Sequence, residues 1–549
     1  MMSKKSINSQ KQKNNKKFHP VIAIFIISSI LWQGSYFPLQ FLLMVVLLLI
    51  TFIVHAKEVV VPLEVGLLFG ISLLCLLSLF LLSEQRYAGI MEFLRTLVFP
   101  LTLLLFLNCD ENSAEKVITG ALMSVAIIGL LAYASVIYIP GAVIASSGRL
   151  QSVLQYANTT ALLMFIGVLY SIDSFRLRKT PQSLVGIVIF ITALLLTGSR
   201  LSFIVSLVVG GLYAFMMLGQ KGKAIIVGMA LLTTFAVFLF SVVSDQRILQ
   251  ISFHEPTLVE RWITFQDALK LLNRNWLLGI GVGNWQQWQY YIQSAPYSVK
   301  YIHNYYLQLF LDGGILAPLL FSATVFPAVI RGIRAKSIHA YILLAIVLRA
   351  TLDFDLIFAA VAMIAMFSLA QLSSRPVPRK VGNVRLLAIV PLILVLSLFM
   401  SEVFSATASL QLQRGNLKSA MEKSEVALAL NPLNTSLYYQ MAQSTRNVQE
   451  TEALLHRAVE ENPLDFSSLK ILILISISNE NYEQALHFVD ALIASRPFSE
   501  EHQELYRRIV IESANQGVIS DAEREQRLAF LDDCLAMVNP LYTQYIKTE

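Results

Sequence analysis

The longest polar interval between apolar segments, residues 260–314, reads ERWITFQDALKLLNRNWLLGIGVGNWQQWQYYIQSAPYSVKYIHNYYLQLFLDGG. It is rich in Trp, Tyr, Arg and His, and its last residues already belong to the next apolar run. A membrane protein that keeps so many residues outside the lipid between two spans usually needs them for a site. We therefore expect the functional site to be built around this interval.

The composition of the whole chain indicates a polytopic membrane protein. Of its 549 residues, 56% are hydrophobic and only 14% are charged, whereas soluble domains carry about 25% charged residues. Cys75, Cys109 and Cys534 show no paired spacing, so neither a disulfide framework nor a zinc site is indicated. We expect no metal site, no cofactor and no nucleic-acid partner.

Apolar runs long enough to cross a bilayer as helices, roughly 17–25 residues, dominate the first four hundred or so residues. We expect an all-α fold in which about twelve or thirteen such spans form a helical bundle. The count is open because the first run is short and residues 338–372 could form one long helix. The candidate spans lie at about 20–35, 37–55, 60–83, 89–108, 117–139, 153–172, 183–199, 201–219, 223–243, 304–330, 338–352, 356–372 and 384–403.

Basic residues near the span ends predict the orientation, because lysine and arginine favour the cytoplasmic side. Residues 1–19 are Lys-rich and lack a convincing cleavage site, so we interpret them as a cytoplasmic tail before a retained first span. The later basic clusters share that side if there are thirteen spans, with 338–372 divided at 351–355. These clusters are Arg176, Arg178 and Lys179; Lys221 and Lys223; Arg331, Arg334 and Lys336; and Arg375, Arg379 and Lys380. The loop at 244–303 and the chain after Ser401 are then predicted to be extracytoplasmic.

The C-terminal region, residues 404–549, changes character and is typical of amphipathic helices. Its prolines Pro432, Pro463 and Pro497 recur at intervals near the ~34-residue period of tetratricopeptide repeats, and small residues such as Ala420 suit two closely packed helices. A last helical stretch at about 499–537 would cap the array. An unrelated helical bundle is the alternative. Either structure is a binding platform, which predicts a protein partner or another assembly component.

The glycines Gly279, Gly281 and Gly283 do not indicate a nucleotide site, because no strand–helix pattern follows them. We interpret them as a tight turn that returns the loop to the membrane surface, in preference to a direct ligand contact.

Three arginines are predicted to lie on the outer face: Arg149, Arg200 at the outer end of a span, and Arg261 at the start of the long loop. The rigid fork of donors on a guanidinium suits phosphate oxygens, so together they favour a phosphorylated, lipid-linked anion. The alternative is that each one extends to lipid head groups as a snorkelling side chain.

His303 precedes Asn304 where the chain re-enters the membrane. Histidine titrates near neutrality and can accept a proton from an attacking hydroxyl. A lone histidine is more often structural, but the neighbouring Asn304, the two tyrosines that follow and the predicted convergence with the arginines favour a functional role.

Other ionisable residues near the spans admit two interpretations. Glu92 and Arg95 are spaced to pair on one helix face, which favours a self-neutralising structural pair over a substrate contact. Arg349, Asp353 and Asp355 cluster at the outer ends of two spans. They could line the same cavity as His303 or form an interfacial salt-bridge group.

A resemblance to a known family rests on motifs spread over about 115–372. It combines Arg149 with Asn158, then Ser199-Arg200, then Arg261-Trp262, then the Gly-x-Gly-x-Gly turn and His303-Asn304-x-x-Leu307-Gln308 before Gly313-Gly314. This set resembles the O-antigen ligase/polymerase superfamily, which includes lipopolysaccharide O-antigen ligases, Wzy-type polysaccharide polymerases and oligosaccharyltransferases of pilin-like proteins. The motifs do not separate these branches. The sequence departs from the pattern at Ala157-Asn158, where a proline usually precedes the asparagine.

The resemblance implies that residues 20–403 form a membrane glycosyltransferase of the GT-C type in the bacterial cytoplasmic membrane. The donor would be a glycan on undecaprenyl pyrophosphate, and the acceptor a glycan, a lipid or a protein. Arg200 and Arg261 would hold the pyrophosphate, His303 would activate the acceptor hydroxyl, and transfer would be metal-independent and inverting. The residues predicted to contact substrate are Arg149, Asn158, Trp262 and Asn304.

Two other classes of protein are alternatives. A multi-span transporter would also contain many spans, but transporters tend to show paired internal repeats, which we do not find in this sequence. A scaffold in which only the repeats act would not need so many spans. Proteoliposome uptake of a labelled solute would favour the transporter.

Overall fold

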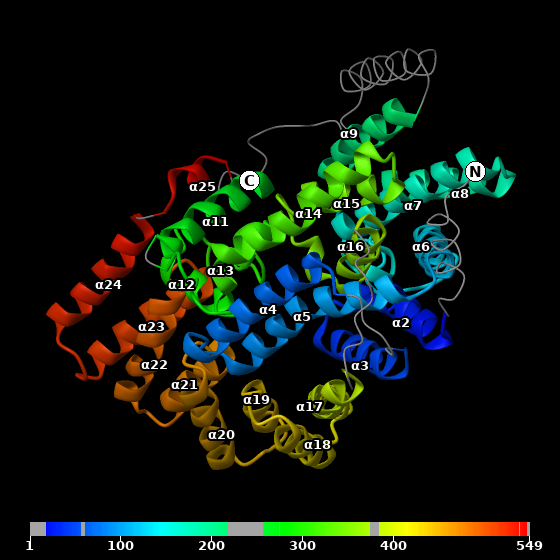
Figure 1. The fold of residues 1–549 in the computed structure, drawn as a ribbon. Helices are drawn as coiled ribbons and strands as arrows, with labels where there is room; N and C mark the ends of the chain where they lie inside the picture. Colours follow the sequence, from blue (N-terminus) through cyan, green and yellow to red (C-terminus); the bar gives the residue numbers. More distant parts are fainter. Residues whose placement is uncertain are drawn as a thin grey trace, which may run out of the picture.

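The computed structural model describes residues 18–55, 61–217, 256–273, 275–373, 384–536 and 538–545. Within these ranges every regular element is a helix, and no β-strand occurs (Figure 1). The all-α prediction is therefore confirmed. The candidate span at 223–243 and nearly all of the basic tail lie outside the described residues.

The first part of the described chain forms a bundle of apolar helices, in which a longer connection, residues 134–156, joins α6 to α7. Proline begins α2 and α8, where the missing N–H would be unpaired anyway, and the Asp110 side chain caps α6. The helices are α2 (Pro20–Leu31), α3 (Pro38–His55), α4 (Leu63–Leu81), α5 (Arg86–Asn108), α6 (Glu111–Tyr133), α7 (Ala157–Arg178), α8 (Pro181–Leu196) and α9 (Arg200–Met217).

The central region combines a polar loop with further apolar helices. Its elements are α11 (Pro256–Leu272), α12 (Trp285–Ile292), α13 (Tyr305–Gly313), α14 (Leu316–Arg334), α15 (Ile338–Arg349), η3 (Asp355–Ile357), α16 (Ala359–Leu372) and α17 (Val384–Gln413). Seven helices of the described chain are long and apolar enough to cross a membrane, and shorter apolar helices accompany them. The chain is therefore a polytopic helical membrane protein.

Two apolar stretches considered as spans are each divided into two helices. The 338–372 stretch divides into α15 and α16 around 351–355, as the charge distribution predicted. The 304–330 stretch is broken into α13 and α14 at Gly314, which has φ +73°. A Cβ at Gly314 would lie 1.8 Å from the carbonyl oxygen of Leu277, so only glycine allows this close approach of the loop.

The C-terminal region is an array of antiparallel helices that begins as a continuation of α17. Its helices are α18 (Leu417–Leu430), α19 (Ser436–Ala442), α20 (Val448–Glu461), α21 (Phe466–Ser478), α22 (Tyr482–Ser495), α23 (Glu500–Asn515), α24 (Asp521–Ala536) and α25 (Pro540–Tyr545). Pro432, Pro463 and Pro497 each follow the end of a helix. The assignment of these pairs as tetratricopeptide repeats stays a prediction.

The array does not project freely from the bundle. It passes α12 and returns to α11, so that α25 lies beside α11 in Figure 1. The Asn539 amide donates to the Ser294 carbonyl at 2.7 Å, and Leu541 and Tyr542 pack on the apolar cluster of the loop. Near the start of the array, the Tyr87 hydroxyl of α5 donates to Glu402 of α17 at 2.6 Å. The array, the loop and one end of the bundle are thus in contact.

Candidate functional site

The centre of the candidate site is the carboxylate of Asp353, in the connector between α15 and α16. It is fully buried, and three cationic or titratable groups reach it from different elements. Nδ1 of His303 lies 3.2 Å from Oδ1, and Nη2 of Arg349 lies 3.1 Å from Oδ2. Nη2 of Arg261 in α11 lies 3.6 Å from Oδ2, while its Nη1 donates to the Leu352 carbonyl at 2.7 Å.

The N-terminal end of α7 adds polar groups to the same carboxylate. Nδ2 of Asn158 donates to Oδ2 of Asp353 at 2.9 Å, and the Tyr156 hydroxyl donates to Oδ1 at 3.0 Å. Arg149 in turn donates from Nη2 to Oδ1 of Asn158 at 3.0 Å and from Nε to the Thr197 carbonyl at 2.8 Å. Arg149, Asn158, Arg261 and His303 were predicted from sequence, and the structure brings them into one network of hydrogen bonds and ion pairs around Asp353.

Electrostatics keep Asp353 ionised despite its burial. Burial alone would raise the pKa of this carboxyl, but the hydrogen bond with His303 and the charges of Arg349 and Arg261 hold it well below its usual range. Burial raises the pKa of the adjacent Asp355, although Arg349 opposes the shift. Asp353 is therefore the more acidic carboxyl of this pair.

An ionised Asp353 determines what His303 can do. Its oxygen can only accept, so Nδ1 of His303 carries the proton that is shared with it. With its proton on Nδ1, the ring has Nε2 as the atom that can accept a proton. The imidazole is 21% exposed and packs against the Phe354 ring at 5.0 Å. This arrangement suits a histidine that accepts a proton from an incoming group.

Arg200 is the first residue of α9 and follows directly on a serine of the network. The Ser199 hydroxyl lies 3.1 Å from Oδ1 of Asn158 and 3.0 Å from the Ser202 hydroxyl. The helix start thus brings Arg200 next to the Arg149–Asn158 pair, while its own role stays a prediction.

The two remaining predicted residues have other surroundings. Trp262 is 56% exposed and forms no hydrogen bond with the network in the described part of the chain. The side chain of Asn304 caps α13 by accepting from the Leu307 amide at 3.0 Å. Asn304 therefore has a structural task beside His303, and substrate binding by either residue stays a prediction.

The pair Glu92–Arg95 in α5 is present, with Nε and Oε1 3.4 Å apart, and it has further partners. Arg95 donates to the Ile357 carbonyl at 2.8 Å and to the Tyr36 carbonyl at 2.6 Å, and the Tyr301 hydroxyl donates to Glu92 at 2.6 Å. Tyr301 precedes His303 by two residues, and Ile357 follows Asp355 by two residues. The pair therefore anchors both connectors that form the site.

The glycine-rich turn anchors the loop on the bundle, in agreement with its interpretation as a turn. Gly279, Gly281 and Gly283 all have positive φ. The Ser83 hydroxyl donates to the Val282 carbonyl at 2.7 Å, and the Ile280 amide donates to the Leu311 carbonyl at 2.8 Å. A Cβ at Gly279 would lie 2.1 Å from that same Leu311 oxygen.

Sequence reasoning left Arg349 and Asp353 undecided and did not single out Tyr156. The usable signal was the four-residue spacing of Arg349 and Asp353 at the end of an apolar run, which puts opposite charges side by side. The contact with His303 joins residues 50 positions apart, which no local pattern contains. No group of His, Cys, Asp and Glu side chains in the described ranges could hold a metal ion.

These features define a class: a polytopic helical membrane protein with a site of arginines, a histidine and a buried carboxylate at one end of its bundle. The family model described as O-Antigen ligase matches residues 185–322, from α8 into α14. The matched segment contains Arg200, Arg261 and His303, and it supports the O-antigen ligase/polymerase superfamily that the motifs predicted. It also supports a membrane glycan-transfer function in general. No curated protein and no solved structure matches the chain.

Proposed function

We propose that the protein transfers or polymerises a glycan from an undecaprenyl-pyrophosphate donor onto an acceptor hydroxyl at the outer face of the cytoplasmic membrane. The observation that carries the proposal is the contact of His303 with a buried, ionised Asp353 beside the guanidinium of Arg261. A base and an anion-binding group thus share one carboxylate.

In the proposed reaction Nε2 of His303 takes the proton of the acceptor hydroxyl as its oxygen attacks the anomeric carbon. The new glycosidic bond forms while the bond from that carbon to the phosphate oxygen breaks, and the lipid pyrophosphate leaves with the electron pair. Attack opposite the leaving group inverts the anomeric configuration. Asp353 orients the imidazole and stabilises its protonated form.

The leaving pyrophosphate needs positive charge, which Arg200 and Arg261 are proposed to supply, with Arg149 as an auxiliary contact. Arg261 is suited to this because its side chain is 17% exposed and its distance of 3.6 Å to Asp353 is that of a loose ion pair. Preorganised donors of this kind would take the place of the metal ion that assists pyrophosphate departure in other enzymes. The proposed reaction is therefore metal-independent.

The test is a transfer assay with purified protein, a lipid-pyrophosphate glycan and an acceptor, with and without a chelator. We expect full activity in chelator and a loss of about 10²-fold or more in His303→Ala and Arg261→Ala. The matched control is Arg176→Ala, which removes an arginine paired with Asp173 near the far end of α7. Loss of activity in chelator, or full activity of either site variant, would contradict the mechanism.

A further inference from the structure

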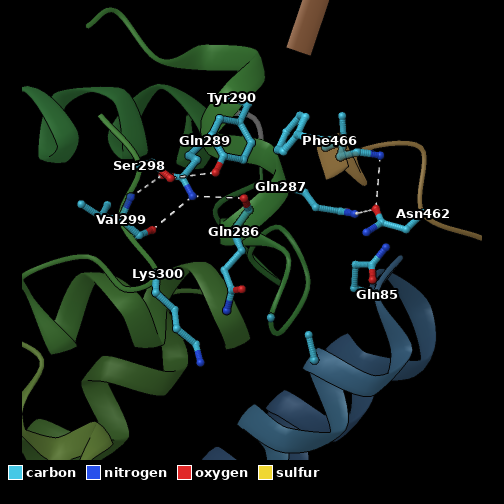
Figure 2. Close-up of a pocket in the computed structure, with 13 residues that line it drawn as sticks. Gln85, Gln286, Gln287, Gln289, Tyr290, Ser298, Val299, Lys300, Asn462 and Phe466 are labelled. Carbon is cyan, nitrogen blue, oxygen red and sulfur yellow. Dashed lines mark hydrogen bonds between the residues drawn. The ribbon is translucent and has the colours of Figure 1, made fainter. Parts of the chain in front are cut away.

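A polar cavity of about 230 Å³ lies where the bundle, the loop and the helical array meet. The bundle contributes Gln85 and Ala88, and the array contributes Asn462, Leu464 and Phe466 (Figure 2). The glycine turn contributes Gly283, and α12 with the segment after it contributes the rest. Five amide side chains line it: Gln85, Gln286, Gln287, Gln289 and Asn462. No carboxylate is among the described residues that line it, and Lys300 is its one charged side chain.

The wall of this cavity is held in place by interactions between the loop and the array. Nε2 of Gln287 donates to Oδ1 of Asn462 at 2.9 Å. Arg496 hydrogen-bonds the Tyr290 hydroxyl and stacks 3.7 Å from the centre of the Phe466 ring. The Gln289 side chain accepts a hydrogen bond from the Val299 amide at 2.9 Å and donates one to the Val299 carbonyl at 3.1 Å. The contacts between the loop and the array, together with the two Gln289–Val299 hydrogen bonds inside the loop, fix the shape of the cavity.

Two of the lining amides remain available for a ligand. The side chains of Gln85 and Gln286 make no hydrogen bond within the described part of the chain. The other three amide side chains, those of Gln287, Gln289 and Asn462, form the hydrogen bonds described above. In Figure 2 Gln286 and Lys300 lie on one side of the cavity and Gln85 on the other. An amide offers both a donor and an acceptor, so two amides on opposite sides of the cavity match hydroxyl groups on opposite edges of one sugar ring better than they match a phosphate.

The cavity is near the proposed reaction centre. Lys300 precedes His303 by three residues, a separation of at most about 11 Å along the chain. The Lys300 ammonium lies 5.5 Å from the Tyr301 ring centre, that ring lies 5.6 Å from the Phe354 ring, and Phe354 lies 5.0 Å from His303. The volume is below the ~300–1,000 Å³ of pockets for drug-sized ligands, which suits a single sugar ring.

We propose that this cavity is a subsite for one non-reacting sugar unit of the acceptor, bound through hydroxyl groups by Gln85 and Gln286. It contains none of the arginines that a pyrophosphate requires, so it serves the acceptor and not the lipid end of the donor. The array, through Asn462 and Phe466, forms part of the substrate site. The assignment to the acceptor rests on the proposed function, but sugar binding in the cavity can be measured without it.

The experiment is saturation-transfer NMR on the full chain in nanodiscs, with the methyl glycosides of glucose, N-acetylglucosamine and glucuronic acid as probes. Empty nanodiscs give the background. We expect at least one probe to receive saturation from the wild type and from His303→Ala, and the signal to fall at least fivefold in Gln85→Leu and in Gln286→Leu. Leucine keeps the side-chain volume and removes only the amide. Gln526→Leu, an exposed position on α24, is the matched control.

Absence of transfer to all three probes, or an undiminished signal in both glutamine variants, would overturn the subsite. Circular dichroism spectra and melting curves that match the wild type establish that the variants are folded. If the transfer assay fails while the sugar signal is present and sensitive to Gln286, the subsite stands and the proposed function falls.

Discussion

The carboxylate of Asp353 accepts hydrogen bonds from α7, α15 and the segment before α13. It also forms an ion pair with Arg261 of α11. Burial of a charge is costly unless it is paired and hydrogen-bonded. Here the cost is offset by two guanidiniums, an imidazole and an amide. The same contacts that make this anion tolerable also fix His303 and Arg261 relative to each other, so one residue links stability to the proposed chemistry.

Replacement of Asp353 by asparagine should therefore reduce glycan transfer by about 10²-fold or more, because the amide no longer fixes the tautomer of His303 or stabilises its protonated form. Folding should survive, since Arg349 keeps its ion pair with Asp355 at 2.9 Å. The measurement is kcat of Asp353→Asn in the transfer assay, with Asp173→Asn as the control at the far end of α7. Wild-type kcat in Asp353→Asn would remove Asp353 from the mechanism.

His502 on α23 makes the helical array sensitive to acid. It is 3% exposed, its Nδ1 has no partner within the described residues, and burial with the charges of Lys470 and Arg496 lowers its pKa to about 4. The unfolded chain binds the proton near pH 6.5, so the unfolded state gains protons first as pH falls. Stability is therefore lost progressively between about pH 6.5 and 4.

We expect about 1–2 kcal/mol of this loss between pH 7.5 and 5. The measurement is thermal unfolding followed by circular dichroism at both pH values, in the wild type and in His502→Gln. The variant should lose less stability on acidification than the wild type. The control is His456→Gln on α20, which removes a half-exposed imidazole from the same array. Equal acid sensitivity of His502→Gln and the wild type would contradict the assignment.

Among the elements, the glycine turn of the loop depends most directly on residue type. Gly279 and Gly415 have nearly the same φ, +77° and +75°, but a Cβ at Gly279 would lie 2.1 Å from a backbone oxygen, whereas none of the atoms around Gly415 is within 4 Å. Alanine at Gly415 should cost about 1 kcal/mol from backbone strain alone. Gly279→Ala should cost clearly more, because the loop must leave α13.

The comparison of Gly279→Ala with Gly415→Ala isolates the steric part, since both carry the same backbone strain. Melting temperatures of the two purified variants are the measurement, together with the yield of monodisperse protein. A Gly279→Ala variant as stable as Gly415→Ala would mean that the loop does not pack on α13 through this turn.

The sequence allowed most elements to be predicted, because apolar length and basic residues are local signals. They located the division between α15 and α16 and the helix ends before Pro432, Pro463 and Pro497. The break at Gly314 was not predicted, since it depends on the distant backbone of Leu277 approaching the chain. For the same reason the contacts of Asp353 could not be predicted, because Asn158, Arg261 and His303 are distant from it in the sequence. The capping role of Asn304 has a local partner, Leu307, and was missed because Asn304 was interpreted as a substrate contact.

On the scale of the whole molecule, the site, the loop and the array share one end of the bundle. Gln287 of α12 contacts Asn462 of the array, and Asn539 near the C-terminus contacts Ser294 of the loop. The helices that begin or end near the site carry their basic clusters at the opposite end, as Arg178 in α7 and Arg334 in α14 do. Because positive charge favours the cytoplasmic side, we expect this basic end to face the cytoplasm and the site end to face away from it.

This polarity predicts the outcome of a topology map. Alkaline phosphatase fused after Gln413 or after Ser294 should be active, because both positions belong to the site end, whereas fluorescent-protein fusions after Lys179 and Lys336 should fluoresce in the cytoplasm. The prediction for the pair at Gln413 and Ser294 does not depend on the number of spans, since the loop and the array touch each other. Opposite locations for those two fusions would contradict the arrangement of the array. A shared cytoplasmic location would instead leave the arrangement intact and reverse the orientation, which would place the site on the side opposite to an outer-leaflet donor.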